Sequence, residues 1–216
     1  MKNALWCVVS VLSGRWAVVR ARSDICFQRS ADHTFGEAHI TEKTLTAFVV
    51  PVISGAFVFV FALRSPSTWL LLAFTLCVAT GLRASLIDID THTIPRHVMV
   101  SASVLLIGVL GAASFVAGTV DTVQVLTSGL ISWVLMRLLE FLSRGDLGHA
   151  DVVLAGYQGL FLGAIGIGLL PSAIFISFVL AGLVALVMIA TKHATRSSHL
   201  PFGPFLFVGM VVTVLR

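Results

Sequence analysis

Seven long apolar stretches follow one another along the chain, and they constrain its fold more than any other feature. A bilayer core about 30 Å thick is crossed by about 20 predominantly apolar residues in a helix. The sequence therefore predicts an all-α fold, a polytopic membrane helical bundle with about seven transmembrane helices, or six to eight. The predicted spans are Leu45–Leu63, Thr68–Ile87, Val98–Gly118, Val123–Leu142, Val152–Leu170, Ser172–Thr191 and the shorter Pro201–Leu215.

The scarcity of charge agrees with a membrane protein. Hydrophobic residues make up 57% of the chain and charged residues only 11%, whereas soluble domains carry roughly 25% charged residues. This composition argues against a soluble enzyme, a disordered protein and a nucleic-acid-binding protein. The 14 Lys and Arg residues exceed the 10 Asp and Glu residues, as expected of a protein in a lipid bilayer with basic cytoplasmic loops.

The positions of the basic residues predict how the chain crosses the membrane. If residues 1–44 lie inside, threading the seven spans places twelve basic residues inside and only Arg64 and Arg216 outside. Cytoplasmic loops carry such an excess of Lys and Arg. Both acidic loops, residues 88–97 and 143–151, are then expected to face the cytoplasm.

The N-terminal segment, residues 1–44, is basic, and the sequence leaves its structure open. Its apolar stretch Ala4–Leu12 resembles the core of a signal peptide, but Ser13–Trp16 is not a clean cleavage site. We expect an uncleaved segment that is either interfacial or an extra short span over Ala4–Val19. Residues 45–216 are expected to form one integral membrane domain.

The cysteines do not predict a metal site or a disulfide framework. None of the three forms a C-x-x-C pair. Cys77 lies in an apolar run and is expected to be a small buried hydrophobic residue. Neither a metal nor a cofactor is therefore expected.

Small residues recur every four positions in the fifth span, at Ala155, Gly159 and Gly163. On a helix this spacing places them on one face, where small residues allow a neighbouring helix to approach closely in lipid. We expect this face to be a packing surface and this helix to be central in the bundle.

Acidic residues at the edge of the hydrocarbon are costly and need an explanation. Asp88 and Asp90 follow the second predicted span, and Asp151 opens the fifth, so both sites are expected at one membrane face. Two carboxylates brought together share a proton. One can then activate a water while the other protonates a carbonyl, as in aspartic proteases, without a metal.

Other interpretations of these acids stay open on spacing alone. Asp88 or Asp90 could end a helix in the headgroups, and Asp151 could be an N-cap. A transporter could use the same aspartates to bind a cation or relay protons.

The remaining polar residues of these loops have simpler expected roles. Asp121 and Asp146 are expected to be loop or cap residues. Glu140 lies three residues after Arg137, so a local ion pair is expected. His149 either tunes an aspartate or contacts substrate, or it is an ordinary interfacial histidine.

Three local patterns occur in order along residues 68–215. They are Ile87-Asp88 with Ile94-Pro95 seven residues later, Gly148-His149-Ala150-Asp151 before a glycine-punctuated helix, and Pro201-Phe202-Gly203-Pro204. Together they resemble the catalytic core of the type IV prepilin peptidases, membrane aspartic proteases of the GxGD type. Taken alone, the Pro-Phe-Gly-Pro run could simply mark the start of a helix, but the order and spacing of the three patterns together are specific.

The resemblance implies an aspartic endopeptidase of the bacterial cytoplasmic membrane, without a cofactor, in which Asp88 and Asp151 are the catalytic pair. Its partner would be a prepilin or pseudopilin-like membrane protein, whose basic leader peptide is cleaved at the cytoplasmic face. The oligomeric state is left open. The residues expected to support the site or to bind substrate are Asp90, Pro95, Gly148, His149, Ala150, Pro201, Gly203 and Pro204.

The chain departs from the family pattern at three places. Ala150 replaces the second glycine of the G-x-G-D motif, and Val153 replaces the lysine that follows it. Residues 1–44 lack the two C-x-x-C pairs of the members that also methylate their product. The resemblance therefore indicates a peptidase-only form, and a catalytically inactive homologue that assists pilus assembly is the alternative.

Overall fold

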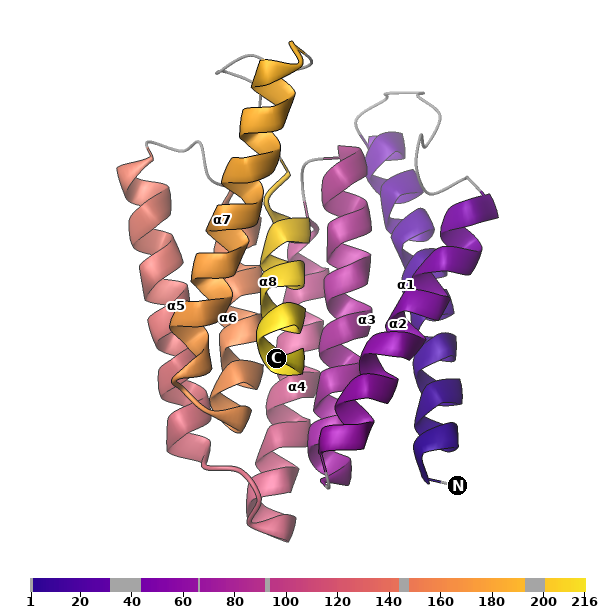
Figure 1. Ribbon diagram of the computed structural model, residues 1–216, viewed down its shortest axis with the longest axis vertical. Coiled ribbons are helices and arrows are strands. Elements are labelled where there is room, and N and C mark those ends of the chain that lie inside the picture. The colour runs from indigo at the N-terminus through magenta and orange to yellow at the C-terminus, as the bar shows by residue number, and fades with distance from the viewer. Residues whose placement is uncertain (1, 32–43, 66, 92–93, 144–147, 193–200) are drawn as a thin grey trace.

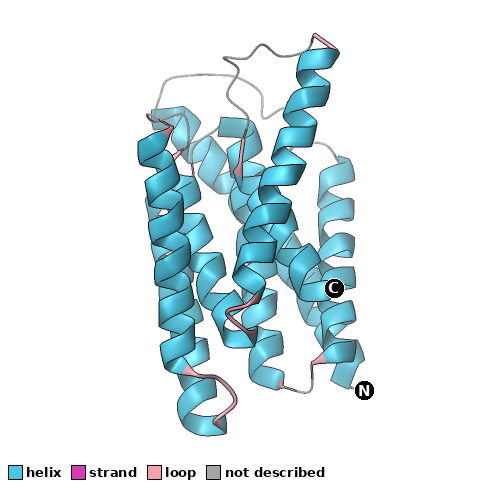
Figure 2. Ribbon diagram, turned by 60° about the vertical axis from the view of Figure 1, so that its left-hand side comes forward, coloured by secondary structure: helices cyan, strands magenta, loops and turns pink. Residues whose placement is uncertain are grey.

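The computed structural model is a bundle of helices (Figures 1 and 2). It describes residues 2–31, 44–65, 67–91, 94–143, 148–192 and 201–216, and within them it contains eight helices and no strand. The all-α prediction is thus confirmed. The helices are α1 (Lys2–Ala31), α2 (Thr44–Arg64), α3 (Thr68–Thr91), α4 (Arg96–Ala117), α5 (Thr122–Leu142), α6 (His149–Ile165), α7 (Leu169–Ala190) and α8 (Gly203–Leu215).

Each of the seven predicted spans corresponds to one of the helices α2 to α8. Among the described residues, four helical segments are long and apolar enough to cross a membrane: Thr68–Thr91, His97–Ala117, Thr122–Leu142 and Leu169–Ala190. The apolar helices Val49–Arg64 and Gly203–Leu215 are shorter. These segments indicate association with a membrane.

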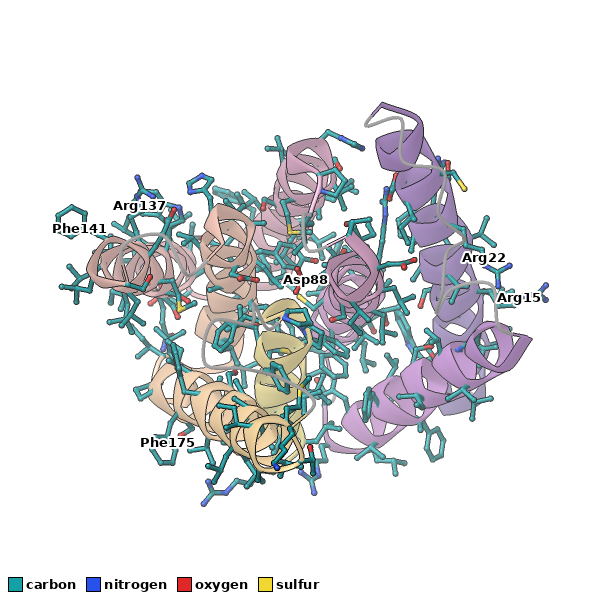
Figure 3. The ribbon with its side chains drawn as sticks, turned by 90° about the horizontal axis from the view of Figure 1, so that it is seen from above. Arg15, Arg22, Asp88, Arg137, Phe141 and Phe175 are labelled. Atoms are coloured by element: carbon teal, nitrogen blue, oxygen red, sulfur yellow. The ribbon has the colours of Figure 1, made fainter. Side chains whose placement is uncertain are left out.

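Large apolar side chains point outward over much of the bundle, as a lipid-facing surface requires. Phe115 is 90% exposed, and Phe141 and Phe175 are also exposed. The latter two point away from the helices in Figure 3. Soluble proteins rarely expose large contiguous apolar patches, so the outer surface agrees with the membrane prediction.

The predicted break between the fifth and sixth spans, at Pro171, is wrong. Helix α6 already ends at Ile165 with Gly166 as its C-cap, and α7 begins at Leu169. Pro171 therefore lies in the first turn of α7. A proline is tolerated there because the first N–H groups of a helix have no partner within it.

The predicted packing face of the fifth span is confirmed in α6. A Cβ at Gly159 would lie 2.6 Å from Ser132 Cβ, and one at Gly163 would lie 2.6 Å from Ser128 Cβ. The Ser132 hydroxyl donates a 2.8 Å hydrogen bond to the Ala155 carbonyl. Only small residues allow α5 and α6 to pack this closely. Helix α6 also packs against α3, α4, α7 and α8, so it is central.

The N-terminal segment contains a helix much longer than the apolar stretch at its start. Helix α1 packs against α2 and α3, and its Ala17 and Ala21 are fully buried. Asp24 forms an ion pair with Arg83 of α3, with 2.6 Å between Oδ2 and Nη2. The Arg83 guanidinium carbon also lies 5.3 Å from the ring centroid of Trp16.

Three chain segments that are distant in sequence meet at one end of the bundle. In Figure 1 the C-terminal end of α3 and the N-terminal ends of α6 and α8 lie toward the top. Helix α3 packs against both α6 and α8, and α6 packs against α8. The candidate aspartates lie at this meeting point.

Candidate functional site

Asp88 lies near the C-terminal end of α3 and is buried. The helix continues to Thr91, so Asp88 and Asp90 belong to its last turns and do not follow it as the sequence predicts. Asp88 is 5% exposed, and it lies near the centre of the bundle seen from above (Figure 3). A carboxyl group so deeply buried needs compensating partners.

Gly203, at the start of α8, provides one such partner. Its backbone N–H donates a 2.9 Å hydrogen bond to Asp88 Oδ2. A Cβ at Gly203 would lie 2.9 Å from the same oxygen, closer than real Cβ contacts allow. The first N–H groups of a helix have no partner within it and favour a negative charge. The glycine thus lets Asp88 sit directly on the N-terminus of α8.

Asp151 lies in the first turn of α6 and has a glycine neighbour of its own. It is 6% exposed, and a Cβ at Gly148, the N-cap of α6, would lie 3.3 Å from Asp151 Oδ2. Within the described residues, Asp151 Oδ1 is buried and has no hydrogen-bond partner. The carboxyl group is thus incompletely compensated for its burial.

The two aspartates interact electrostatically. Burial, and then the charge of Asp88, raise the pKa of Asp151 to about 7, and a hydrogen bond from the Gly148 backbone opposes this change. The ordinary value is about 3.9. Asp151 lies outside the four apolar segments that are long enough to cross a membrane. A carboxyl group that is partly protonated near neutral pH can act as a proton donor there.

His149 points away from this pair. Its side chain is 63% exposed, and its Nδ1 lies 3.5 Å from Glu140 Oε2 on α5. Glu140 also pairs with Arg137 at 2.5 Å, which confirms the predicted local ion pair. His149 is therefore an exposed residue that lies beside Glu140. Asp121 is an N-cap, as predicted, and accepts a 2.9 Å hydrogen bond from the Val123 N–H.

The other predicted supporting residues lie at or near the ends of helices. Pro95 is the extended N-cap of α4. Pro201 and Pro204 flank the start of α8, and Asp90 and Ala150 are half-buried. Asp146, which is expected to be a loop or cap residue, lies outside the described residues.

Cys77 is fully buried, as predicted for a small hydrophobic residue. Among the described residues, no three His, Cys, Asp or Glu side chains group as ligands for a metal ion.

Tyr157 is a buried polar residue near the site that the sequence patterns do not predict. It lies on α6, six residues after Asp151, and is 2% exposed. It is the only tyrosine of the chain, and it precedes the buried Gln158 in the helix. That isolation is the signal that could have identified it, since a buried tyrosine usually needs a partner for its hydroxyl.

No known protein family, curated protein or solved structure matches the chain. Its function must therefore be argued from the residues of the site.

Proposed function

We propose that this chain is an intramembrane aspartic endopeptidase that removes the basic leader peptide of prepilin-like membrane proteins. The observation that carries the proposal is the buried, electrostatically coupled pair Asp88 and Asp151, contributed by two helices that meet at one end of the bundle. The contact between Asp88 and Gly203 supports it. It joins two of the three motifs that resemble the prepilin peptidases.

The environments of the two aspartates suit different roles. The Gly203 N–H and the N-terminus of α8 stabilise the ionised form of Asp88. Burial and the neighbouring charge favour the protonated form of Asp151. Two carboxyl groups in such different environments can serve as base and acid. Asp88 is then the general base and Asp151 the general acid.

The reaction follows from these roles. Asp88 accepts a proton from a water, whose oxygen attacks the carbonyl carbon of the scissile peptide bond. Asp151 donates its proton to the carbonyl oxygen, which gives a neutral tetrahedral intermediate. A proton then passes from Asp88 to the amide nitrogen as the C–N bond breaks, and Asp151 recovers its proton from the intermediate. Neither aspartate bonds covalently to the substrate.

The substrate class is the one that the resemblance to the prepilin peptidases implies. A prepilin-like protein has a short basic leader followed by an apolar helix that can lie against the bundle in the membrane. The predicted threading puts most of the 14 basic residues on the side of the two acidic loops, so the end with the aspartates would face the cytoplasm.

Cleavage by the purified chain in liposomes tests the proposal. The wild type is expected to release the leader of a prepilin, and Asp88→Asn and Asp151→Asn are each expected to abolish release while leaving membrane insertion intact. Asp121→Asn is the matched control, because it makes the same change at an N-cap where Asn serves as well as Asp.

Two results would contradict the proposal in different ways. Full cleavage by Asp151→Asn would refute the catalytic pair. No cleavage by the folded wild type would favour the inactive homologue, for which Ala150 and Val153 are the sequence argument. Aspartate-dependent ion flux in the same liposomes would instead favour a transporter.

A further inference from the structure

A cavity of about 310 Å³ lies between α1, α3, α4 and α6. Helix α3 contributes residues within 75–83 to its lining, and α4 contributes residues within 98–105. Trp16 lines it from α1, and Tyr157 lines it from α6. The two helices that carry the aspartates, α3 and α6, thus both border the cavity.

The cavity begins at about the same depth below both aspartates. Arg83, at one end of the α3 lining, precedes Asp88 by five residues, which is about 7.5 Å of helix rise. Tyr157 follows Asp151 by six residues, which is about 9 Å along α6. The C-terminal end of α3 and the N-terminal end of α6 lie at the same end of the bundle (Figure 1). The cavity therefore lies on the side of the aspartates that faces the middle of the bundle.

The cavity is open to the outer surface of the bundle. Of the residues that line it, Trp16 on α1 is 45% exposed and Leu105 on α4 is 59% exposed. Helices α3 and α4 contain two of the four segments long and apolar enough to cross a membrane. A group that enters between these helices comes from the lipid and must be apolar, because polar groups are costly in the hydrocarbon.

The polar groups of the lining are mostly paired with the protein itself. Arg83 is the one charged residue among the described residues that line the cavity, and its Nε and Nη2 lie 2.8 and 2.6 Å from Asp24 Oδ2. The hydroxyls of Ser13, Thr75 and Ser101 each donate a 2.8 Å hydrogen bond to a carbonyl of their own helix. The lining therefore favours an uncharged apolar group.

The volume of the cavity fits a large side chain and excludes a whole helix. An apolar cavity of about 150 Å³ binds one benzene, so a cavity of about 310 Å³ accepts a group as large as an aromatic ring. A helix about 10 Å wide would fill roughly 900 Å³ over the ~12 Å of the α3 lining. Such a helix can lie against the outer surface and insert one side chain. The small residues Ala79 and Ala102 in the lining leave space for it.

We propose that this cavity is the docking site for the apolar segment of the peptidase substrate, and that one large apolar side chain of that segment fills it. The inference rests on the proposed function, in which the basic leader stays at the cytoplasmic face and the apolar segment enters the membrane. An extended chain covers the 7.5 to 9 Å from the aspartates in about three residues, at about 3.3 Å each. The inserted side chain is thus expected about three residues after the cleaved bond.

Photo-crosslinking in liposomes tests the location without requiring cleavage. The Asp151→Asn protein is used, so that an added prepilin stays intact. A benzophenone amino acid in place of Leu105, at the mouth of the cavity, is expected to crosslink to the apolar segment of the prepilin. The same amino acid in place of Gly182 is the control, because a Cβ there meets no atom within 4 Å and α7 lies on another side of the bundle (Figure 3). It is expected to give no crosslink to the prepilin.

A filled cavity provides the kinetic test. Ala102→Leu is expected to raise the KM for a prepilin about 10- to 100-fold with little change in kcat, because the inserted side chain contributes binding and lies away from the reacting atoms. Alanine at the inserted position of the prepilin is expected to raise KM similarly with the wild-type chain and to add little with Ala102→Leu. Gly111→Leu is the matched control, nine residues further on the opposite face of α4, where a Cβ meets no atom within 4 Å. Its KM is expected to equal that of the wild type.

The two tests separate this inference from the proposed function. Cleavage by the wild type without a crosslink from Leu105, or with an unchanged KM for a folded Ala102→Leu protein, overturns the docking site and leaves the peptidase. A crosslink from Leu105 to the prepilin without cleavage by the wild type refutes the peptidase and supports the docking site. Equal crosslinking from Leu105 and Gly182, or crosslinks from Leu105 to lipid alone, overturns the docking site.

Discussion

Replacing Gly203 by alanine tests whether the start of α8 positions Asp88 for catalysis. The new Cβ would lie 2.9 Å from Asp88 Oδ2 and 3.4 Å from its Cγ. Gly203 does not have the positive φ that would strain an alanine. The substitution therefore acts through this contact and leaves the local backbone favourable for a helix.

The magnitude follows from the geometry. The Cβ contact must lengthen from 2.9 Å to at least the 3.4 Å of an ordinary contact, so the carboxylate moves away and its 2.9 Å hydrogen bond from the Gly203 N–H is stretched and weakened. A hydrogen bond to a charged group is worth about 1.5–3 kcal/mol. If that energy is lost from the transition state, kcat falls about 10- to 150-fold, since about 1.36 kcal/mol is tenfold in rate.

Leader cleavage under single-turnover conditions, together with thermal unfolding in detergent, is the assay. Gly182→Ala is the control, because a Cβ at that position of α7 meets no atom within 4 Å. Its kcat is expected to stay at the wild-type value. A folded Gly203→Ala protein that also cleaves at the wild-type rate would refute the positioning role of α8.

Two further predictions concern the charge of the site and the packing of the bundle. Because the pKa of Asp151 is raised to about 7, its protonated fraction, and with it the cleavage rate, is expected to fall about tenfold per pH unit above that value. The raised pKa also makes the folded chain less stable as pH rises from about 4 to about 7, because the unfolded chain loses this proton at a lower pH than the folded chain. In the Asp151→Asn variant the melting temperature should depend less on pH over that range. A pH dependence equal to that of the wild type would contradict the raised pKa of Asp151. Gly159→Ala would place a Cβ 2.6 Å from Ser132 Cβ and 2.9 Å from the Ser128 carbonyl oxygen, and is expected to destabilise the chain by about 1–3 kcal/mol. Gly108→Ala, with no atom within 4 Å, is expected to be neutral or slightly stabilising by the same unfolding measurement, and equal melting temperatures for the two variants would refute the packing argument.

The sequence alone determined the fold class and the approximate position of α2 to α8. Runs of about 20 apolar residues have few alternatives to membrane helices, and the spacing of Ala155, Gly159 and Gly163 identified the face that packs on α5. The ends of the helices were less certain. Asp88 falls inside α3 and Pro171 inside α7, because a few polar residues or one first-turn proline do not end a helix when packing and capping favour its continuation.

The sequence also selected Asp88, Asp151 and Gly203, because acids are rare in such a chain and the three motifs occur in order. It could not show that these residues meet, since 63 residues separate Asp88 from Asp151 and Gly203 is 115 residues from Asp88. Only the packing of α3, α6 and α8 decides that Gly203 donates to Asp88, that His149 turns to Glu140, and that Tyr157 lines a cavity. Periodicity and charge act locally along the chain, whereas burial and hydrogen bonding between distant helices depend on how the whole bundle packs.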